Sequence, residues 1–300
     1  MKKILLFGKT GQVGWELQRA LVPLGSVIGV DTHSTEICGD FRDPQGVAET
    51  VRLIRPDIVV NAAAYTAVDK AESEYKLAYL INAASVEAIA RETEALNAWF
   101  VHYSTDYVFP GTGDLPWDEN DRPAPLNVYG ETKLAGEKFI QQECSKYLIF
   151  RTSWVYAAKG NNFVKAMLRL ATERHEISVV NDQFGAPTGA ELLADCTAHA
   201  ISIAMNKTDV TGLYHLVATG TTNWFEFAQL IFAEARKAGL TLAVQKINAI
   251  TSDSYPTPAK RPLNSRLNTT KFTQKFGLTL PHWENGVKRM LAEVSTPASV

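Results

Sequence analysis

Tyr129 and Lys133 are the residues whose types and spacing most clearly indicate chemistry. They stand four positions apart in a segment that reads as a helix, so their side chains should share one face. A free tyrosine has a pKa of about 10, and a nearby cation that stabilises its phenolate would let it donate a proton at neutral pH. We expect Tyr129 to be that donor and Lys133 to supply the charge. The same spacing also arises by chance, with the tyrosine half-buried and the lysine solvated, so the surroundings must decide.

A predicted strand over residues 99–103 ends at Ser104, Thr105 and Asp106. Ligands of open α/β sheets bind at the carboxyl ends of strands. A hydroxyl at this position could therefore hold a substrate carbonyl beside Tyr129. The glycine- and proline-rich residues 110–126 that follow are expected to form a loop leading into the helix of Tyr129 and Lys133.

A glycine-rich turn follows the first predicted strand, residues 4–7, and precedes a predicted helix. Backbone N–H groups at such a turn can bind a dinucleotide diphosphate, and glycine lets the ligand approach closely. The spacing is G-x-x-G-x-x-G rather than G-x-G-x-x-G, and glycines here could instead serve only to tighten packing. The residues that we expect to bind the cofactor at this turn are Gly8, Gly11, Gln12, Val13 and Gly14.

Asp31 follows the second predicted strand, residues 26–30. An acidic residue roughly 20 positions beyond the glycine turn can bind the ribose hydroxyls of NAD. No arginine follows it at once to accept a 2′-phosphate, which favours NADH without excluding NADPH. The other interpretation is an aspartate that only starts a turn.

Two further segments are candidates for cofactor binding. Asp40 and Phe41 are expected at the end of a third strand, where a carboxylate and a ring could hold the adenine. After a fourth strand over residues 57–61 comes a loop of small residues containing Ala63, Ala64 and Tyr65, across which a dinucleotide could lie. The alanines could also serve close packing of helix on sheet.

Trp154 and Arg261 are candidates for contact with a substrate. Trp154 follows the predicted strand 147–152 and could stack on a ligand or belong to the core. Arg261 lies in the proline-rich residues 252–266 and could bind a diphosphate. It could equally be a surface charge.

The alternation of apolar strands and helices predicts an α/β fold, a Rossmann-like doubly wound parallel sheet with a smaller α/β substrate-binding domain at the C-terminus. We expect residues 1–155 to form the dinucleotide-binding domain, completed by segments such as 177–190 and 212–240. Residues 156–300 should be mainly substrate-binding. A long helix is expected over residues 72–96, and the tail from Ser295 should be frayed.

Composition excludes several classes of protein. The 300 residues carry a formal net charge of −2, which gives no field to attract nucleic acid or an anionic membrane. The three cysteines are odd in number and lack the spacing of a disulfide framework or a zinc site. No segment approaches the ~20 apolar residues of a membrane span. The first apolar run is too short for a signal peptide, so we expect a cytoplasmic protein.

Together, the glycine turn, Asp31, the Ser104-Thr105 strand end and the Tyr129–Lys133 pair resemble the extended short-chain dehydrogenase/reductases. Longer motifs, including Ser104-Thr-Asp-Tyr-Val-Phe109 and Asp182-Gln-Phe-Gly-Ala-Pro-Thr188, resemble the dTDP-4-dehydrorhamnose reductase family within that superfamily. The resemblance implies NADH- or NADPH-dependent reduction of a nucleotide sugar at C4. It implies a catalytic trio of Thr105, Tyr129 and Lys133, with Lys133 also holding the nicotinamide ribose, and substrate contacts from Thr105, Asp106, Trp154 and Arg261.

Members of this family are also associated with Mg²⁺ and with dimers. The chain has carboxylates enough for Mg²⁺, but no compact spacing indicates which residues would bind it, so the metal ligands stay unknown.

Two other functions stay open. One is a nucleotide-sugar 4-epimerase that keeps its NAD bound. The other is a non-catalytic NADP-binding regulatory subunit, against which the intact Tyr129 and Lys133 count. The coenzyme preference, the oligomeric state and the residues that select thymine are not determined.

Overall fold

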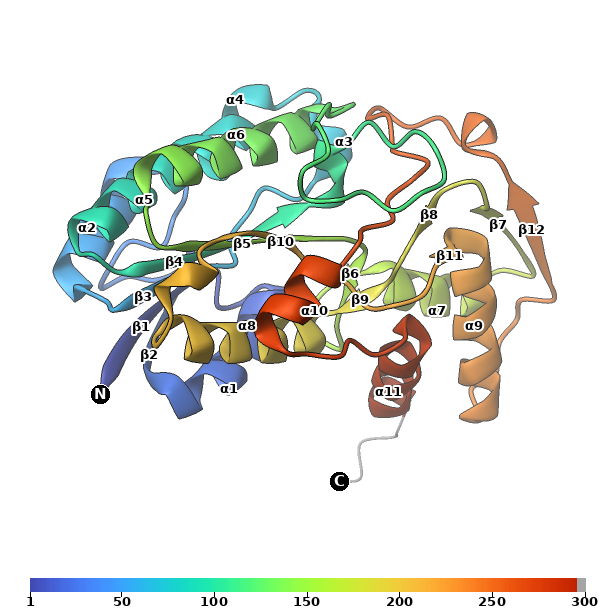
Figure 1. The fold of residues 1–300 in the computed structure, drawn as a ribbon. Helices are drawn as coiled ribbons and strands as arrows, with labels where there is room; N and C mark the ends of the chain where they lie inside the picture. The colour runs from blue at the N-terminus through green and yellow to red at the C-terminus, as the bar shows by residue number, and fades with distance from the viewer. Residues whose placement is uncertain (296–300) are drawn as a thin grey trace.

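The structure is a computed structural model in which residues 1–295 are described. Its centre is a sheet of six strands in the order β10-β5-β4-β3-β1-β2, all paired in parallel (Figure 1). The expected fraying from Ser295 concerns residues 296–300, which lie outside the described residues. The strands are β1 (Lys2–Phe7), β2 (Gly25–Val30), β3 (Ile58–Asn61), β4 (Trp99–Thr105), β5 (Tyr147–Thr152) and β10 (Gly212–His215).

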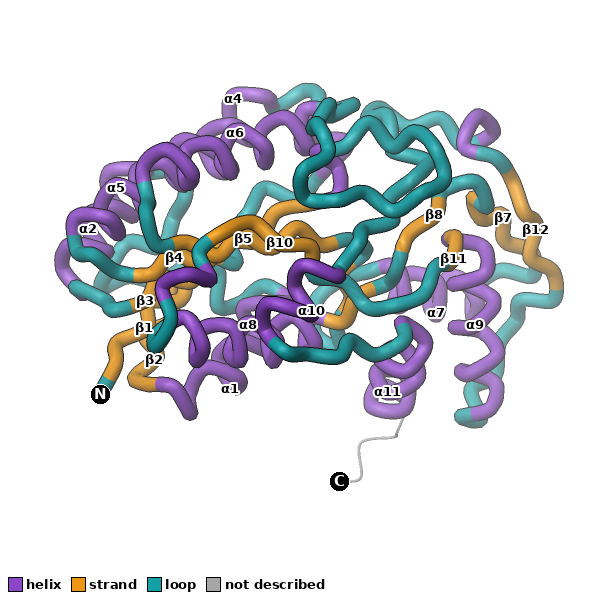
Figure 2. The backbone as a smooth tube through the Cα atoms, viewed as in Figure 1, coloured by secondary structure: helices purple, strands orange, loops and turns teal. Residues whose placement is uncertain are grey.

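Helices cover both faces of this sheet (Figures 1 and 2), which is why its central strands are continuous apolar runs. On one face lie α1 (Gln12–Leu21), α8 (Ala190–Ala204) and α10 (Thr270–Phe276). On the other lie α2 (Pro44–Ile54), α5 (Ser85–Ala95) and α6 (Val128–Glu143). The expected doubly wound α/β fold is confirmed.

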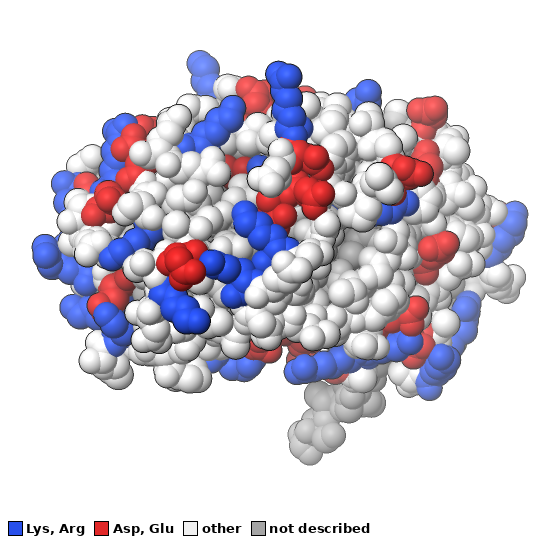
Figure 3. Space-filling model, viewed as in Figure 1, with Lys and Arg blue, Asp and Glu red and all other residues white. Residues whose placement is uncertain are grey.

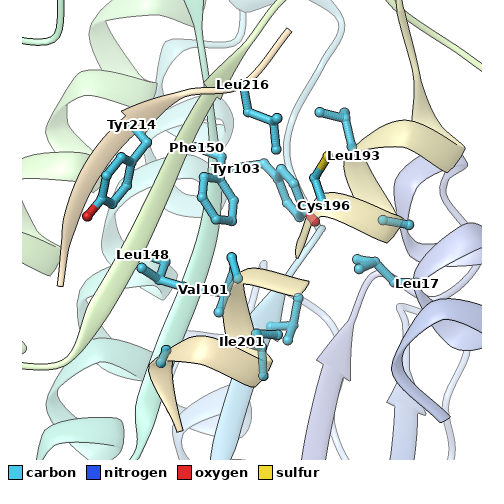
Figure 4. Packing of buried hydrophobic residues seen from close by; sticks show 14 of the residues in the cluster. Leu17, Val101, Tyr103, Leu148, Phe150, Leu193, Cys196, Ile201, Tyr214 and Leu216 are labelled. Atoms are coloured by element: carbon cyan, nitrogen blue, oxygen red, sulfur yellow. The ribbon is translucent and has the colours of Figure 1, made fainter. Parts of the chain in front are cut away.

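The core between the sheet and the first helix layer is built from residues distant in the sequence (Figure 4). Leu17 of α1 and Ile201 of α8 pack with Val101 and Phe150 of the sheet, and all four are buried. Each such side chain contributes about 1.5–3 kcal/mol by leaving water. This packing fixes α1, and with it the glycine turn, against the strands.

The chain reverses direction across the sheet between β2 and β3. It passes from β1 out to β2 and then returns to β3 on the other side of β1. At such a reversal the loops diverge and leave a crevice at the carboxyl ends of the strands. The glycine turn after β1 and the alanine loop after β3 both open into this crevice.

The long helical stretch expected over residues 72–96 is confirmed from Tyr75 to Ala95, but it is not regular α-helix throughout. It consists of α4 (Tyr75–Tyr79), a π-helical turn (η2, Leu80–Ala84) and then α5, and the short helix α3 (Val68–Ala71) precedes it. Asn82 in the π turn explains the interruption, because its Oδ1 accepts from the Tyr65 N–H (2.8 Å) and its Nδ2 donates to Thr132 Oγ1 (3.1 Å). A π turn reorients one side chain, and such turns occur frequently at functional sites.

The third strand that we expected before Asp40 does not form. Residues 35–41 are a loop, since Gly39 packs directly against the backbone of Asp31 and the segment joins no strand ladder. Phe41 is nevertheless buried, with its ring edge-on to Phe7 at 5.3 Å. Asp40 and Phe41 thus still reach the end of the sheet.

A second, smaller lobe lies beyond β10 (Figure 1). It packs around its own buried cluster, which includes Phe227 and Trp283. Its helices are α7 (Phe163–Glu173), α9 (Trp224–Lys237) and α11 (Trp283–Ser295). Its strands pair two by two: β7 (Glu176–Val180) with β12 (Lys246–Ile250), β6 (Val155–Tyr156) with β9 (Thr188–Gly189), and β8 (Phe184–Gly185) with β11 (Thr222–Asn223).

Only one of the two segments expected to complete the large sheet does so. Residues 212–215 form β10 and pair with β5, whereas residues 176–180 pair with β12 in the smaller lobe. The burial pattern gives the reason. Strand β7 alternates exposed and buried residues, which suits a sheet covered on one side, whereas β10 is almost wholly buried.

The surface carries both signs of charge. In the view of Figure 3, basic and acidic side chains are interspersed over the face shown. Within residues 1–295, none of the helices is both long enough and apolar enough to span a lipid bilayer.

Candidate active site

The glycine turn after β1 leaves the start of α1 open. Gly8 has φ +79°, and a Cβ there would lie 2.7 Å from the Ala63 nitrogen, so a side chain would collide with the alanine loop. Gly11 is the N-cap of α1, and no side chain caps the helix. The N–H groups of the first turn are thereby left for a ligand, and the helix dipole favours an anion there.

A cavity of about 420 Å³ lies at the carboxyl ends of the strands, next to this turn. Eleven of the predicted cofactor residues line it, from five separate segments of the chain. They are Gly8, Gly11, Gln12, Val13, Asp31, Asp40, Phe41, Ala63, Ala64, Tyr129 and Lys133.

Two predicted cofactor residues are not part of the lining. Gly14 lies inside α1, and a Cβ there would collide with the Gly8 carbonyl, so this glycine serves the packing of the helix on the turn. The Tyr65 hydroxyl donates to Glu74 Oε2 (2.6 Å), and its backbone is held by Asn82. The structure therefore gives both residues local roles beside the cavity.

Asp31 is buried at the cavity wall. Burial raises the pKa of Asp31, but hydrogen bonds from the His33 N–H and the Thr10 side chain outweigh this effect and hold the pKa below its ordinary value. Asp31 is therefore a carboxylate at neutral pH. Asp40 also lines the cavity and accepts a bidentate pair from Arg42, from Nε to Oδ1 (3.0 Å) and from Nη2 to Oδ2 (2.6 Å), which lowers the pKa of Asp40. Arg42 is a cation in the lining that the sequence analysis did not single out.

Tyr129 stands in the first turn of α6. The side chain of Asn127 caps this helix by accepting from the Gly130 N–H (2.9 Å), which fixes where the helix begins. The Tyr129 ring packs edge-on against Tyr107 at 5.6 Å. Burial and the charge of Asp106 raise the pKa of Tyr129 to about 12, although a hydrogen bond with Thr105 lowers it.

Lys133 is fully buried one turn further along α6 and lines the same cavity. Its Nζ donates to the Tyr103 carbonyl (2.6 Å) and lies 3.1 Å from His102 Nε2. Burial lowers the pKa of Lys133 to about 8. In the structure, the group whose hydrogen bond lowers the pKa of Tyr129 is Thr105. That Lys133 supplies the charge that favours the phenolate stays a prediction.

Thr105 ends β4, and Asp106 begins the 3₁₀ turn that follows it, close to Tyr129. Thr105 Oγ1 donates to Asp106 Oδ1 (2.9 Å) and accepts from the Tyr107 N–H (3.1 Å). Burial raises the pKa of Asp106 to about 6. This site thus holds a hydroxyl, a phenol and a carboxylate whose proton affinities depend on one another.

Two buried hydroxyls in the cavity wall support the binding of a ligand. Ser104 Oγ and Thr152 Oγ1 have no hydrogen-bond partner within the described part of the chain, and both residues line the cavity. Unpaired buried polar atoms are rare because each costs free energy. The sequence analysis did not predict Thr152 and Tyr103 as residues of the cavity lining. Their positions near the carboxyl ends of predicted strands could have indicated it.

Trp154 and Arg261 do not line this cavity. Trp154 has φ +49° and stacks on Trp224 with ring centroids 3.8 Å apart. Arg261 forms a bidentate pair with Asp69 (3.0 and 2.8 Å). Its charge acts on Tyr107, which touches Tyr129, so Arg261 lies at the same end of the molecule as the cavity.

No metal site emerges from residues 1–295. These residues contain no group of three or more His, Cys, Asp or Glu side chains arranged to hold a metal ion. The expected Mg²⁺ therefore stays a prediction without a ligand set.

A parallel sheet with a glycine turn, and a Tyr-x-x-x-Lys pair facing the same cavity, define an NAD(P)-dependent oxidoreductase of the extended short-chain dehydrogenase/reductase class. The sequence matches the family described as RmlD substrate binding domain over residues 1–296, and the chain belongs to this family.

Similar proteins agree with this assignment. The chain is 70% identical over 297 residues to the dTDP-4-dehydrorhamnose reductase of Escherichia coli (strain K12) and 68% identical to that of Shigella flexneri, with 99% of each chain covered. Among solved structures, dTDP-4-dehydrorhamnose reductase from Bacillus anthracis in complex with NADP is similar, with a TM-score of 0.87 and 37% identity. The match covers 97% of this chain and 99% of that one.

Proposed function

We propose that the protein is a reductase that transfers hydride from NAD(P)H to C4 of dTDP-4-dehydro-L-rhamnose and so forms dTDP-L-rhamnose. The observation that carries this proposal is the convergence of the glycine turn, Asp31, Tyr129 and Lys133 on one cavity. The 70% identity to a dTDP-4-dehydrorhamnose reductase over nearly the whole chain supports the substrate. Production of a precursor for lipopolysaccharide or O-antigen would follow from this reaction.

The cavity suits a dinucleotide. The uncapped start of α1 and the close turn at Gly8 would hold the diphosphate, and Asp31 would accept hydrogen bonds from the adenosine ribose. The bound coenzyme would supply the hydride. The relative from Bacillus anthracis was solved with NADP, so NADPH as well as NADH belongs to the proposal.

Tyr129 would supply the proton. Its pKa of about 12 keeps the hydroxyl protonated at neutral pH, as a general acid for a developing alkoxide requires. Thr105 would orient this hydroxyl through their hydrogen bond and contact the sugar. Lys133 would hold the nicotinamide ribose. Asp106 would bind the sugar as well.

Trp154 and Arg261 are proposed as substrate contacts because of where they lie in the chain and in the fold. Trp154 would offer a ring face to the sugar and Arg261 a guanidinium to the diphosphate of the nucleotide. Because Arg261 is already paired with Asp69, we expect it to exchange or share that partner when substrate binds.

The test is the loss of absorbance of NADH, and separately of NADPH, when the pure protein meets dTDP-4-dehydro-L-rhamnose made in situ by an epimerase. Stoichiometric oxidation supports the proposal and ranks the two coenzymes. Cofactor binding without oxidation would remove the 4-keto reductase assignment. NAD that stays bound through purification would then favour a 4-epimerase.

Magnesium, a homodimer and a cytoplasmic location belong to the same proposal as predictions. The role of Mg²⁺ is tested by activity measured before and after treatment with EDTA. The homodimer is tested by the mass from analytical sedimentation of the same samples. Unchanged rates and unchanged mass after metal removal would contradict a role for Mg²⁺.

A further inference from the structure

A row of buried hydrogen bonds lies behind Lys133. Asn61 at the end of β3, His102 in β4 and Lys133 in α6 are 1%, 0% and 2% exposed. Asn61 Nδ2 lies 3.0 Å from His102 Nδ1, and His102 Nε2 lies 3.1 Å from Lys133 Nζ. The three groups thus connect the middle of the sheet to the wall of the cavity.

The backbone fixes the orientation of the Asn61 amide. Asn61 Oδ1 accepts from the Ala63 N–H at 2.9 Å. If the amide were turned over, its NH₂ group would face that N–H, and two donors would meet in a buried site. Nδ2 is therefore the atom that faces His102, and it donates to Nδ1.

This orientation determines the tautomer of His102. A ring nitrogen that accepts a hydrogen bond carries no proton, so the neutral imidazole must carry its proton on Nε2. Burial, and then the charge of Lys133, lower the pKa of His102 well below its ordinary value, so the doubly protonated ring is disfavoured. The Nε2–H consequently points at Lys133 Nζ.

Only the neutral amine of Lys133 has a lone pair that can accept this hydrogen bond. As an amine, Nζ accepts from His102 and still donates to the Tyr103 carbonyl at 2.6 Å. As an ammonium, it would face the Nε2–H with a proton of its own, and a buried donor would stay unpaired.

We propose that His102, oriented by Asn61, is a positioning residue that holds Lys133 and favours its neutral amine in the cofactor-free protein, so that Lys133 gains its charge when NAD(P)H binds. The role of the charged form rests on the proposed reductase function. In that step the lone pair of Nζ takes one proton from an acid in the solvent, whose own bond to that proton breaks, and Nζ no longer accepts the hydrogen bond from His102 Nε2–H. Lys133 thereby becomes a cation when an anionic coenzyme lies in the cavity.

The charged groups around Lys133 are compatible with this step. Burial lowers the pKa of Lys133 to about 8, and the charge of Glu137 in the same helix raises it. Glu137 is itself paired with Arg151, which limits its effect. His102 lies directly against Lys133 Nζ, and the other titratable or charged groups in the cavity lining are Asp31, Asp40, Arg42, Tyr103 and Tyr129.

The first test reads the tautomer directly. Nitrogen-15 NMR of the cofactor-free protein labelled at histidine should show the His102 ring with its proton on Nε2 and a bare Nδ1, with the signal assigned by its loss in His102→Gln. A proton on Nδ1 overturns the proposal. The measurement on the wild-type protein needs neither substrate nor a stable variant.

The second test reverses the tautomer. In Asn61→Asp, the new carboxylate would accept from both the Ala63 N–H and the His102 Nδ1–H, so Nε2 would become an acceptor for the Lys133 ammonium. Calorimetric titration with NADH at pH 8 in two buffers of different ionisation enthalpy should show proton uptake by the wild type, and uptake reduced by about twofold or more in the variant. Asn223→Asp adds a carboxylate at the cap of α9 and should leave the uptake unchanged.

The outcomes separate the two proposals. Equal uptake in the wild type and in Asn61→Asp overturns the role of His102 while the reductase function stands. If the wild type binds no NADH or NADPH, the proposed function fails, and the tautomer measurement still decides how His102 holds Lys133.

Discussion

At the scale of single residues, the surroundings of Tyr129 suit the role of proton donor that we propose for it. Tyr129 has a pKa near 12 because it is buried and lies close to Asp106, and the nearby hydroxyl of Thr105 works in the opposite direction. A tyrosine of this kind keeps its proton until charge develops on a bound substrate. In the proposed reaction, the developing charge on the substrate would therefore trigger the proton transfer.

Tyr129→Phe should lower kcat by about 10²–10⁴-fold, because general acid catalysis contributes a factor of this size. Steady-state kinetics with both coenzymes measure the loss, and fluorescence titration should show a modest change in NADH binding. Tyr147→Phe, at the opposite end of β5, is the matched control. Near-normal turnover in Tyr129→Phe would remove the role that we assign to this residue.

Asp31→Ala should weaken the binding of NADH more than that of NADPH. The carboxylate can accept hydrogen bonds from both hydroxyls of the adenosine ribose but repels a 2′-phosphate. Dissociation constants for the two coenzymes, measured side by side, give the ratio. Equal losses would contradict our reason for preferring NADH.

At the scale of elements, the position of α6 determines the site, because this helix carries both Tyr129 and Lys133. A buried ion pair holds it to the sheet: Arg151 of β5 donates from Nε and Nη2 to Glu137 of α6, at 2.9 and 2.6 Å. Both side chains are almost fully buried, and the guanidinium also lies over the Phe109 ring. The pair therefore fixes the distance between α6 and the end of the sheet.

Glu137→Gln should destabilise the protein by about 3–5 kcal/mol, because removal of one partner leaves the Arg151 charge buried without compensation. Urea unfolding followed by circular dichroism measures the change. The control is Glu173→Gln, which breaks an exposed pair within α7 and should cost about 0.3–0.5 kcal/mol. If the two variants lost equal stability, the buried pair would not be what holds α6.

At the scale of the whole molecule, burial of His215 makes folding sensitive to acid. This residue ends the edge strand β10, is 0% exposed and packs edge-on against Phe109. Burial and the charge of Arg151 lower the pKa of His215 to about 3. The unfolded chain binds a proton below about pH 6.5, whereas the folded protein does not, so stability is lost as the pH falls below 6.5.

His215→Gln should remove this dependence. The difference in unfolding free energy between the wild type and the variant should shrink by about 2 kcal/mol from pH 7 to pH 5. Urea unfolding at the two pH values measures it, and His33→Gln replaces an exposed histidine as the control. A difference that stays constant with pH would show that His215 is not held neutral by the fold.

The sequence by itself determined the elements and the composition of the site. Continuous apolar runs predicted the parallel strands, and local spacing placed the glycine turn, Asp31 and the Tyr129–Lys133 pair at the ends of these elements. These signals are local because a strand, a turn or one helical face is built from residues close in the chain. They sufficed for the fold class, the family and eleven of the residues that line the cavity.

The tertiary structure alone decided the partners of these residues. The π turn at Asn82, the pairing of β7 with β12 and the contact of Lys133 with His102 all join segments far apart in the chain. No local pattern encodes such contacts, since they depend on how helices and strands pack. For the same reason the sequence predicted that Lys133 would place a charge beside Tyr129, but not that its Nζ would be buried between the Tyr103 carbonyl and the His102 ring.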